Sequence, residues 1–161
     1  MSLRAIITAA LAIAQATNKI GKLYPHRVWS ATDVAVKNLF VTNKLLDVCF
    51  ITRESSDSQD RGPNNSFRMP LLLLDWYRAK NRAEDDSTNS EDAFQDDVEA
   101  VMDAFDANRK FRTGSPAVSN AHWSGPMKCR VLNVVNFCGT TCDHAELVIQ
   151  VEDGPRSTMS A

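Results

Sequence analysis

The stretch from residue 127 to residue 151 constrains the fold most, because apolar side chains occupy alternate positions on both sides of a short turn. The alternating apolar residues are Met127, Cys129, Val131, Val135, Phe137, Ala145, Leu147, Ile149 and Val151. A period of two places successive side chains on opposite faces of a strand. The intervening Cys-Gly-Thr-Thr, residues 138–141, contains Gly139. We therefore expect a β-hairpin with a four-residue loop and, with it, an antiparallel sheet.

Two earlier segments are predicted to be strands of the same sheet. Residues 45–53 alternate in polarity, and both faces of this strand are expected to be partly covered. Residues 71–77 follow Pro70, which we expect to mark the start of the strand. The leucines at 71–74 suit a strand that is buried on both faces, either at the centre of a sheet or under a neighbouring subunit. The polar residues 54–66 between the two strands are predicted to form a long loop.

Two helices are predicted from apolar residues at intervals of three and four. The stronger prediction is an acidic helix that begins with a capping box at Thr88 and Glu91 and ends before Gly114. Its apolar stripe consists of Phe94, Val98, Val101, Met102 and Phe105. The other predicted helix runs from Leu3 to about Ile20. Its apolar stripe consists of Leu3, Ile6, Ile7, Ala10, Leu11 and Ala14.

The N-terminal segment has a second interpretation. Arg4, the apolar residues 5–14 and the sequence Ala14-Gln15-Ala16 together have the pattern of a secretory signal peptide. We favour the amphipathic helix, because its apolar residues recur at core-facing intervals. Without export, the four cysteines are expected to be reduced thiols. Residues 30–40 remain ambiguous between a short helix and a strand.

The charges are distributed unevenly, although the net charge is only -2. Ten of the twenty acidic residues, and no basic residue, lie between Glu84 and Asp106. This split favours a polar contact surface or self-assembly and argues against a nucleic-acid reader, which carries a clustered basic stripe. No apolar run is long enough to span a bilayer. We expect one α+β domain over residues 1–153, with a small, mainly antiparallel sheet of about four strands, two main helices on one side, and a polar tail at 154–161.

Cys138, Cys142 and His144 are the candidate metal ligands, since Cys142 and His144 lie on the same face of the second hairpin strand. A structural zinc site needs four ligands, typically in two close pairs. The possible fourth ligands are all isolated in the sequence: Cys49, Cys129, His26 and His122. We favour the alternative that the cysteines pack as small apolar residues. No nucleophile, phosphate-loop or metalloprotease motif is present, so we predict no catalytic residue, no metal and no cofactor.

The motifs of the C-terminal half resemble a known family. The segment LLLLDWYRAKN leads into an acidic helix that contains Phe94-Gln95-x-x-Val98. The second strand of the hairpin then begins with Cys142-x-His144-Ala145-Glu146. Over residues 67–153 this combination resembles the tail terminator, or tail completion, proteins of long-tailed bacteriophages. The resemblance rests on pattern and carries no catalytic signature, and residues 21–44 lie outside it.

This resemblance implies a structural virion protein and not an enzyme. Such proteins form a ring, commonly of six copies, at the head-proximal end of the tail, where they end polymerisation of the tail tube. The expected partners are other copies of the chain, the tail-tube protein and a head-completion or neck protein. DNA would only pass through the ring lumen, and no membrane is involved. The expected location is the virion tail, and the host cytoplasm during assembly.

Three alternatives remain open. Two belong to the same class, namely a head-completion or neck adaptor and a tail-tube subunit. The third belongs to another class, a small metal-binding protein or enzyme built on Cys138, Cys142 and His144. A tube subunit would polymerise into long tubes alone, whereas a terminator would stop at a ring.

The interface of the ring is expected to combine the leucine-rich strand with charged residues. The predicted interface residues are Leu71, Leu72, Leu73, Leu74, Arg78, Lys80, Asp96, Glu99, Asp103, Lys128 and Arg130. The three acidic residues share one face of the predicted helix with Asp92. A heterologous interface pairs two different patches, so this face would meet basic residues of the next subunit. The alternative is that the acidic residues form only the solvated face of an amphipathic helix.

Overall fold

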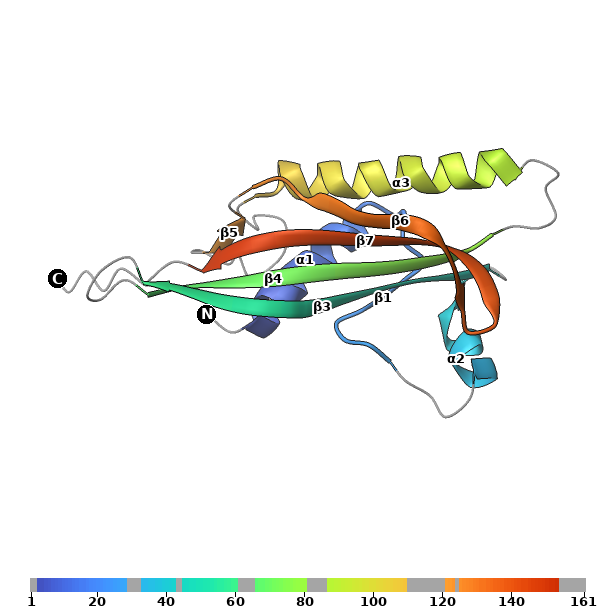
Figure 1. Ribbon diagram of the computed structural model, residues 1–161, viewed down its shortest axis with the longest axis horizontal. Helices are drawn as coiled ribbons and strands as arrows, with labels where there is room; N and C mark the ends of the chain where they lie inside the picture. Colours follow the sequence, from blue (N-terminus) through green and yellow to red (C-terminus); the bar gives the residue numbers. More distant parts are fainter. Residues whose placement is uncertain are drawn as a thin grey trace.

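The computed structural model describes residues 3–28, 33–42, 45–60, 66–80, 87–109, 121–123 and 125–153. The elements, in chain order, are α1 (Leu3–Ala16), β1 (Lys22–Tyr24), α2 (Asp33–Phe40), β2 (Val41–Thr42), β3 (Leu45–Asp60), β4 (Ser66–Ala79), α3 (Ser87–Ala107), β5 (Ala121–Trp123), β6 (Lys128–Phe137) and β7 (Thr140–Asp153). The long strands run along the long axis of the molecule, α3 runs nearly parallel to them, and α1 crosses behind the sheet (Figure 1). The predicted α+β class is confirmed.

A mixed sheet forms the centre of the molecule. Its main path is β1-β3-β4-β7-β5, while β2 pairs with β3 and β6 pairs with β7. Each of the four long strands β3, β4, β7 and β6 is antiparallel to its neighbours among them, as predicted, whereas β1 is parallel to β3. The prediction missed β1, β2 and β5, which have three, two and three residues. Strands this short are too brief to show a period in the sequence.

The hairpin of β3 and β4 is longer than predicted. Its ladder extends from the pair Asp47–Arg78 to the pair Asp60–Ser66. Residues 54–60, which we expected in a loop, therefore belong to β3, and residues 61–65 lie outside the described part of the chain. The register shifts between Arg53 and Ser55, where the apolar alternation of the sequence also stops. Backbone pairing with β4 maintains the strand beyond this point, whatever the polarity of its side chains.

Pro70 lies inside β4 and not at its start, contrary to the prediction. It is paired with Ser56 of β3. On the other side of β4, the described ladder with β7 passes from Arg68 directly to Leu71. Because proline has no N–H to donate, it is tolerated where a ladder is interrupted. Proline is therefore compatible with a position inside a strand where the ladder of hydrogen bonds is interrupted, as well as with a strand end.

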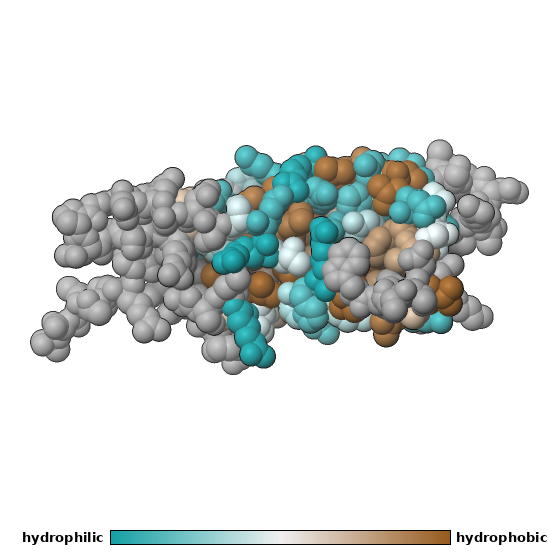
Figure 2. Space-filling model, turned by 60° about the horizontal axis from the view of Figure 1, so that its bottom comes forward, coloured by the Kyte–Doolittle hydropathy of each residue, from teal (hydrophilic) through white to brown (hydrophobic). Residues whose placement is uncertain are grey.

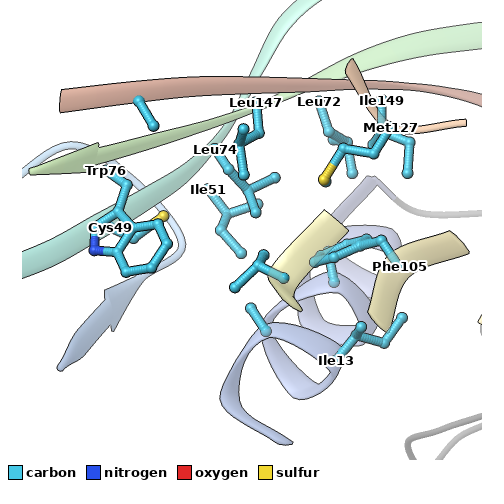
Figure 3. Packing of buried hydrophobic residues seen from close by; sticks show 14 of the residues in the cluster. Ile13, Cys49, Ile51, Leu72, Leu74, Trp76, Phe105, Met127, Leu147 and Ile149 are labelled. Carbon is cyan, nitrogen blue, oxygen red and sulfur yellow. The ribbon is translucent and has the colours of Figure 1, made fainter. Parts of the chain in front are cut away.

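Both long helices pack on one face of the sheet, as predicted. In Figure 3 the side chains of the strands point towards the helices, and Phe105 of α3 lies near Ile13 of α1. The buried residues of this core are Ile6, Ala9, Ala10, Ile13, Ala14, Cys49, Ile51, Leu72, Leu74, Trp76, Phe94, Val98, Val101, Phe105, Met127, Ala145, Leu147, Ile149 and Val151. The apolar stripe predicted for α3 is thus confirmed, with Met102 only partly buried.

The helix ends differ from the predictions by a few residues. α1 ends at Ala16, because Asn18 takes a left-handed conformation with φ of 55° and stops the helix before Ile20. α3 begins at Ser87, so Thr88 lies in its first turn and not at the capping position. Residues 33–40 of the ambiguous segment form α2.

The opposite face of the sheet carries a smaller apolar cluster. Its aromatic residues have ring centroids 4.1 to 6.4 Å apart. They are Tyr24, Phe40, Phe50, Tyr77 and Phe137. α2 lies at this end of the molecule, beside the β6–β7 turn (Figure 1). Among the residues coloured in Figure 2, hydrophobic side chains form several separate groups between hydrophilic ones.

Candidate functional site

A buried Asp–His pair lies on the face of the sheet opposite α1 and α3. Nε2 of His144 on β7 is 2.8 Å from Oδ1 of Asp75 on β4. The two residues are 6% and 2% exposed. Alternation along β4 turns Asp75 away from the core that holds Leu74 and Trp76. An isolated buried carboxylate costs free energy, so Asp75 must be paired. The strands that carry its partners are therefore held beside β4.

The second oxygen of Asp75 has two further partners. Oδ2 accepts a hydrogen bond from the hydroxyl of Tyr77 at 3.1 Å and one from the guanidinium of Arg27 at 3.0 Å. Burial, together with the charge of Asp75, raises the pKa of Tyr77 well above its usual value, so the phenol keeps the proton that it donates. Arg27 follows β1 and is half exposed. Asp75 therefore links β4, β7 and the segment after β1.

Both ring nitrogens of His144 face oxygen atoms. Nδ1 lies 2.9 Å from Oδ1 of Asn133 on β6, and the ring stacks on Tyr77 with centroids 4.6 Å apart. A histidine that acts as a general base needs one nitrogen directed at its substrate. In this arrangement neither nitrogen is available for that role. The immediate effect of the network is to hold β4, β6 and β7 together.

Arg130 crosses the same face of the sheet next to this network. Its Nε and one terminal nitrogen donate to Oε2 of Glu146 on β7, at 3.0 and 2.8 Å. Its other terminal nitrogen donates to both oxygens of Glu54 on β3, at 2.7 and 2.9 Å. Since β7 and β4 lie between β6 and β3, Arg130 and its two glutamate partners together bridge these four strands. Its ion pairs are partly exposed and screened by water, so each contributes little to stability.

The candidate ligands Cys138, Cys142 and His144 do not converge in the part of the chain that the structure describes. Within the described residues, the group whose ligand atoms converge is Asp75, His144 and Glu146, with all atoms within 4.8 Å of one another. Cys142 is buried in the aromatic cluster, in agreement with an apolar role. All four cysteines lie in the described part of the chain, and no disulfide joins them.

The hairpin turn is tighter than predicted. Phe137 pairs with Thr140, so the loop contains only Cys138 and Gly139 and not four residues. Both loop residues have positive φ, 50° and 72°. Positive φ at both positions is the signature of a type I′ turn, whose twist matches that of the flanking strands.

Replacing Cys138 by asparagine is expected to stabilise the protein by about 0.5 to 1 kcal/mol, because Asn-Gly is the preferred pair in a type I′ turn. Gly139→Ala is the matched control, and it should destabilise by about 1 kcal/mol or more because its φ favours glycine. Urea unfolding measures both changes. A destabilised Cys138→Asn variant would contradict the turn assignment.

The leucine run does not form the surface that we expected. Leu72 and Leu74 lie in the core under the helices, and both are 0% exposed. Leu73 is 5% exposed on the opposite face, and Leu71 is partly buried. The chain therefore buries most of this run itself, and no neighbouring subunit is needed to cover it. Of the two covers predicted for this run, the structure shows the central position in the sheet, because β4 lies between β3 and β7. A sequence pattern shows burial but not which chain provides it.

Arg78 and Lys80 are also occupied within the chain. Arg78 pairs with Asp47 at 3.0 Å and with Asp97 of α3 at 2.7 Å. Lys80 pairs with Glu91 and with the buried Asp143, both at 3.3 Å. Arg78 at the end of β4 and Lys80 directly after the strand thus both pair with α3 inside the chain. The predicted interface residues that remain exposed are Asp96, Glu99, Asp103, Lys128 and Arg130.

Arg78→Ala is expected to lower the free energy of unfolding by about 1 to 3 kcal/mol at pH 7. Burial alone would raise the pKa of Asp97, but hydrogen bonds from Lys19 and Arg78 outweigh burial and lower it. A lowered carboxyl pKa contributes stability above the unfolded value, about 3.9, and that stability is lost as the pH falls through the lower folded pKa. The gap between variant and wild type should therefore shrink below about pH 4. Urea unfolding at pH 7 and pH 3 measures this gap, and an equal gap at both would contradict the role of Asp97.

The residues of the Asp75 network were missed by sequence reasoning, apart from His144. One signal was present, since Asp75 directly follows four leucines and a charge in such a run must be paired. Arg27, Tyr77 and Asn133 come from three distant parts of the chain. No local pattern could have joined them to Asp75.

No protein-family model matches the chain, and no curated protein sequence matches it. Across the described residues, no helix is both long and apolar enough to cross a bilayer.

Proposed function

We propose that the chain is a subunit of a ring that caps the tail tube of a long-tailed bacteriophage. The ring ends polymerisation of the tube and joins the tail to the neck below the head. It contains six copies of the chain, and it contacts the tail-tube protein on one side and a head-completion or neck protein on the other. DNA passes through its lumen during ejection.

The exposed edge strand β6 is the observation that carries this proposal. Seven of its ten residues are exposed, including the apolar Leu132 and Val134 at 45% and 47%. Within the described residues β6 pairs only with β7, so its outer edge offers unpaired backbone groups. Such an edge is a template for another chain unless charge, proline or a covering segment protects it. A subunit that is completed by its neighbours needs a surface of this kind.

A second support is the location of the segment that resembles tail terminators. Residues 67–153 supply β4, β7 and β6, which are neighbours in the sheet, and α3, which packs on them. The resembling residues thus form one continuous part of the fold. They are not scattered over separate parts of the molecule.

Assembly of the purified protein tests this proposal directly. Native mass measurement should give a closed oligomer, and electron microscopy with tail-tube protein should show tubes that end at a cap. Val134→Lys should prevent ring formation, because it places a charge on the exposed edge. The matched control is Val34→Lys, which places the same charge on another element, since Val34 lies on α2 and is 71% exposed. A monomer that leaves tube growth unchanged would overturn the proposal.

Two alternatives of the same class give different results in this experiment. A tail-tube subunit would form long tubes without a partner, and a neck adaptor would bind the completed tail without stopping tube growth. The alternative of another class, a small metal-binding protein or enzyme, would be favoured by a protein that stays monomeric and binds metal at Asp75, His144 and Glu146.

The acidic face of α3 is expected to contribute to the ring. Asp96, Glu99 and Asp103 are exposed, and reversing all three charges together should weaken the ring. Each exposed pair contributes less than about 1 kcal/mol, so single reversals should have little effect. The oligomer fraction in native mass measurement, at low and high salt, checks the prediction. An unchanged oligomer would mean that this face is only solvated.

A further inference from the structure

Asp75, His144 and Glu146 lie on neighbouring strands with their ligand atoms within 4.8 Å of one another. We propose that they bind a divalent transition-metal ion such as Zn²⁺ or Mn²⁺, through one imidazole nitrogen and two carboxylate oxygens. All three ligands come from one chain, so the site does not depend on the ring proposed above.

In Asp75 and in His144, one side-chain atom faces the proposed site and is called the inner atom. The other, outer atom is hydrogen-bonded to a neighbouring residue. Oδ1 of Asp75 and Nε2 of His144 face each other at 2.8 Å. The outer atoms are held elsewhere: Oδ2 of Asp75 by Arg27 and Tyr77, and Nδ1 of His144 by Asn133. Metal-binding histidines characteristically use their other nitrogen in this way, and the partner fixes the orientation of the ring.

Glu146 follows the same pattern. Both hydrogen bonds from Arg130 end on its Oε2. Oε1 accepts no hydrogen bond from a described residue, so it is available as the third ligand atom. Asp75 and His144 are buried on strands, which are rigid elements that hold ligands in place.

The geometry and the donor types define the class of ion. Two ligand atoms at right angles, each about 2.1 Å from a metal, are about 3.0 Å apart. The separation of 2.8 Å between Nε2 and Oδ1 therefore fits one edge of an octahedron. Imidazole suits Zn²⁺ and Fe²⁺, whereas carboxylate suits Mn²⁺, and no thiolate takes part. Water would complete the coordination.

The local charge also favours a cation. The carboxylates of Asp75, Glu146 and Glu54 contribute three negative charges, and the guanidiniums of Arg27 and Arg130 contribute two positive ones. With a neutral imidazole, one negative charge remains. The ion would replace the hydrogen bond between Nε2 and Oδ1 by lying beside the line that joins them, and the outer hydrogen bonds would stay in place.

Isothermal titration of chelator-treated, full-length protein with Zn²⁺, and separately with Mn²⁺, tests the site. We expect one ion per chain. Asn133→Ala should weaken binding about 10- to 100-fold, because it removes only the residue that orients His144. Glu146→Gln should weaken binding at least about 10-fold, since it removes a charged ligand. His144→Gln would remove the imidazole ligand, but His144 is buried and this variant can fail to fold. Glu146 and Asn133 are not fully buried, so their variants keep the test decisive in that case.

His122→Gln is the matched control. His122 also lies beside a carboxylate, with Nε2 3.5 Å from Glu152, but it is half exposed and outside the proposed site. Its replacement should leave the affinity unchanged. The proposal is overturned if the folded wild-type protein binds neither ion at one per chain. It is equally overturned if Asn133→Ala and Glu146→Gln leave binding unchanged, or if His122→Gln abolishes it.

Discussion

Replacing Phe105 by alanine is expected to lower the free energy of unfolding by about 3 to 5 kcal/mol. Phe105 lies on α3 and is 0% exposed. Figure 3 places its ring between Ile13 of α1 on one side and, on the other, Ile149 of β7 and Met127, which directly precedes β6. Removing the ring leaves a cavity where both helices meet the sheet, and a close-packed core refills such a space only in part.

Asp103→Ala on the same helix is the control, because Asp103 is exposed and the change should stay within about 0.5 kcal/mol. Urea unfolding, followed by circular dichroism, measures both variants. A loss of less than about 1.5 kcal/mol for Phe105→Ala would contradict the packing described for this core.

The sequence predicted best those elements whose apolar pattern repeats over many consecutive residues. α3 shows its stripe over three turns, and the β6–β7 hairpin alternates over both strands, so a few residues suffice to recognise each. Both helices also pack on the side of the sheet that their stripes require. Each of these elements buries one face. The geometry of a helix or a strand sets the spacing of the residues on that face, so the apolar spacing in the sequence identifies the element.

The parts that could not be predicted depend on distant pairing. The polar residues 54–60 have no strand pattern, and they form a strand only because β4 lies beside them. Likewise the turn at Cys138 has two residues because the ladder continues to Phe137 and Thr140. In both cases backbone hydrogen bonds to another segment decide the structure, and side-chain polarity alone does not report them.

The candidate site shows the same limit. His144 was singled out from its spacing to Cys142, yet its partners are Asp75 and Asn133 on two other strands. Leu72 and Arg78 were predicted as interface residues, yet their contacts lie within the chain, for a related reason. Apolar and charged residues on a strand indicate that partners exist, but a sequence does not say whether the partner is a neighbouring strand, a helix or another subunit.

Asp75→Leu is expected to destabilise the protein by about 3 to 5 kcal/mol, because it leaves buried partners without their carboxylate. Nε2 of His144 and the hydroxyl of Tyr77 both lose the acceptor that they have now. Arg27 is half exposed, so water can replace its bond more readily. The size of the effect comes from the unpaired groups that remain and not from the hydrogen bonds alone.

A double-mutant cycle distinguishes this network from a simple loss of volume. Replacing both Asp75 and His144 by leucine removes the buried polar pair together, which is often nearly neutral in a well-packed interior. The double variant should therefore be destabilised by less than the sum of the two single variants, with a coupling of about 1 to 3 kcal/mol. Urea unfolding of the four proteins measures this coupling. Additive effects would mean that Asp75 and His144 contribute independently, and the network would then not hold β4 and β7 together as a unit.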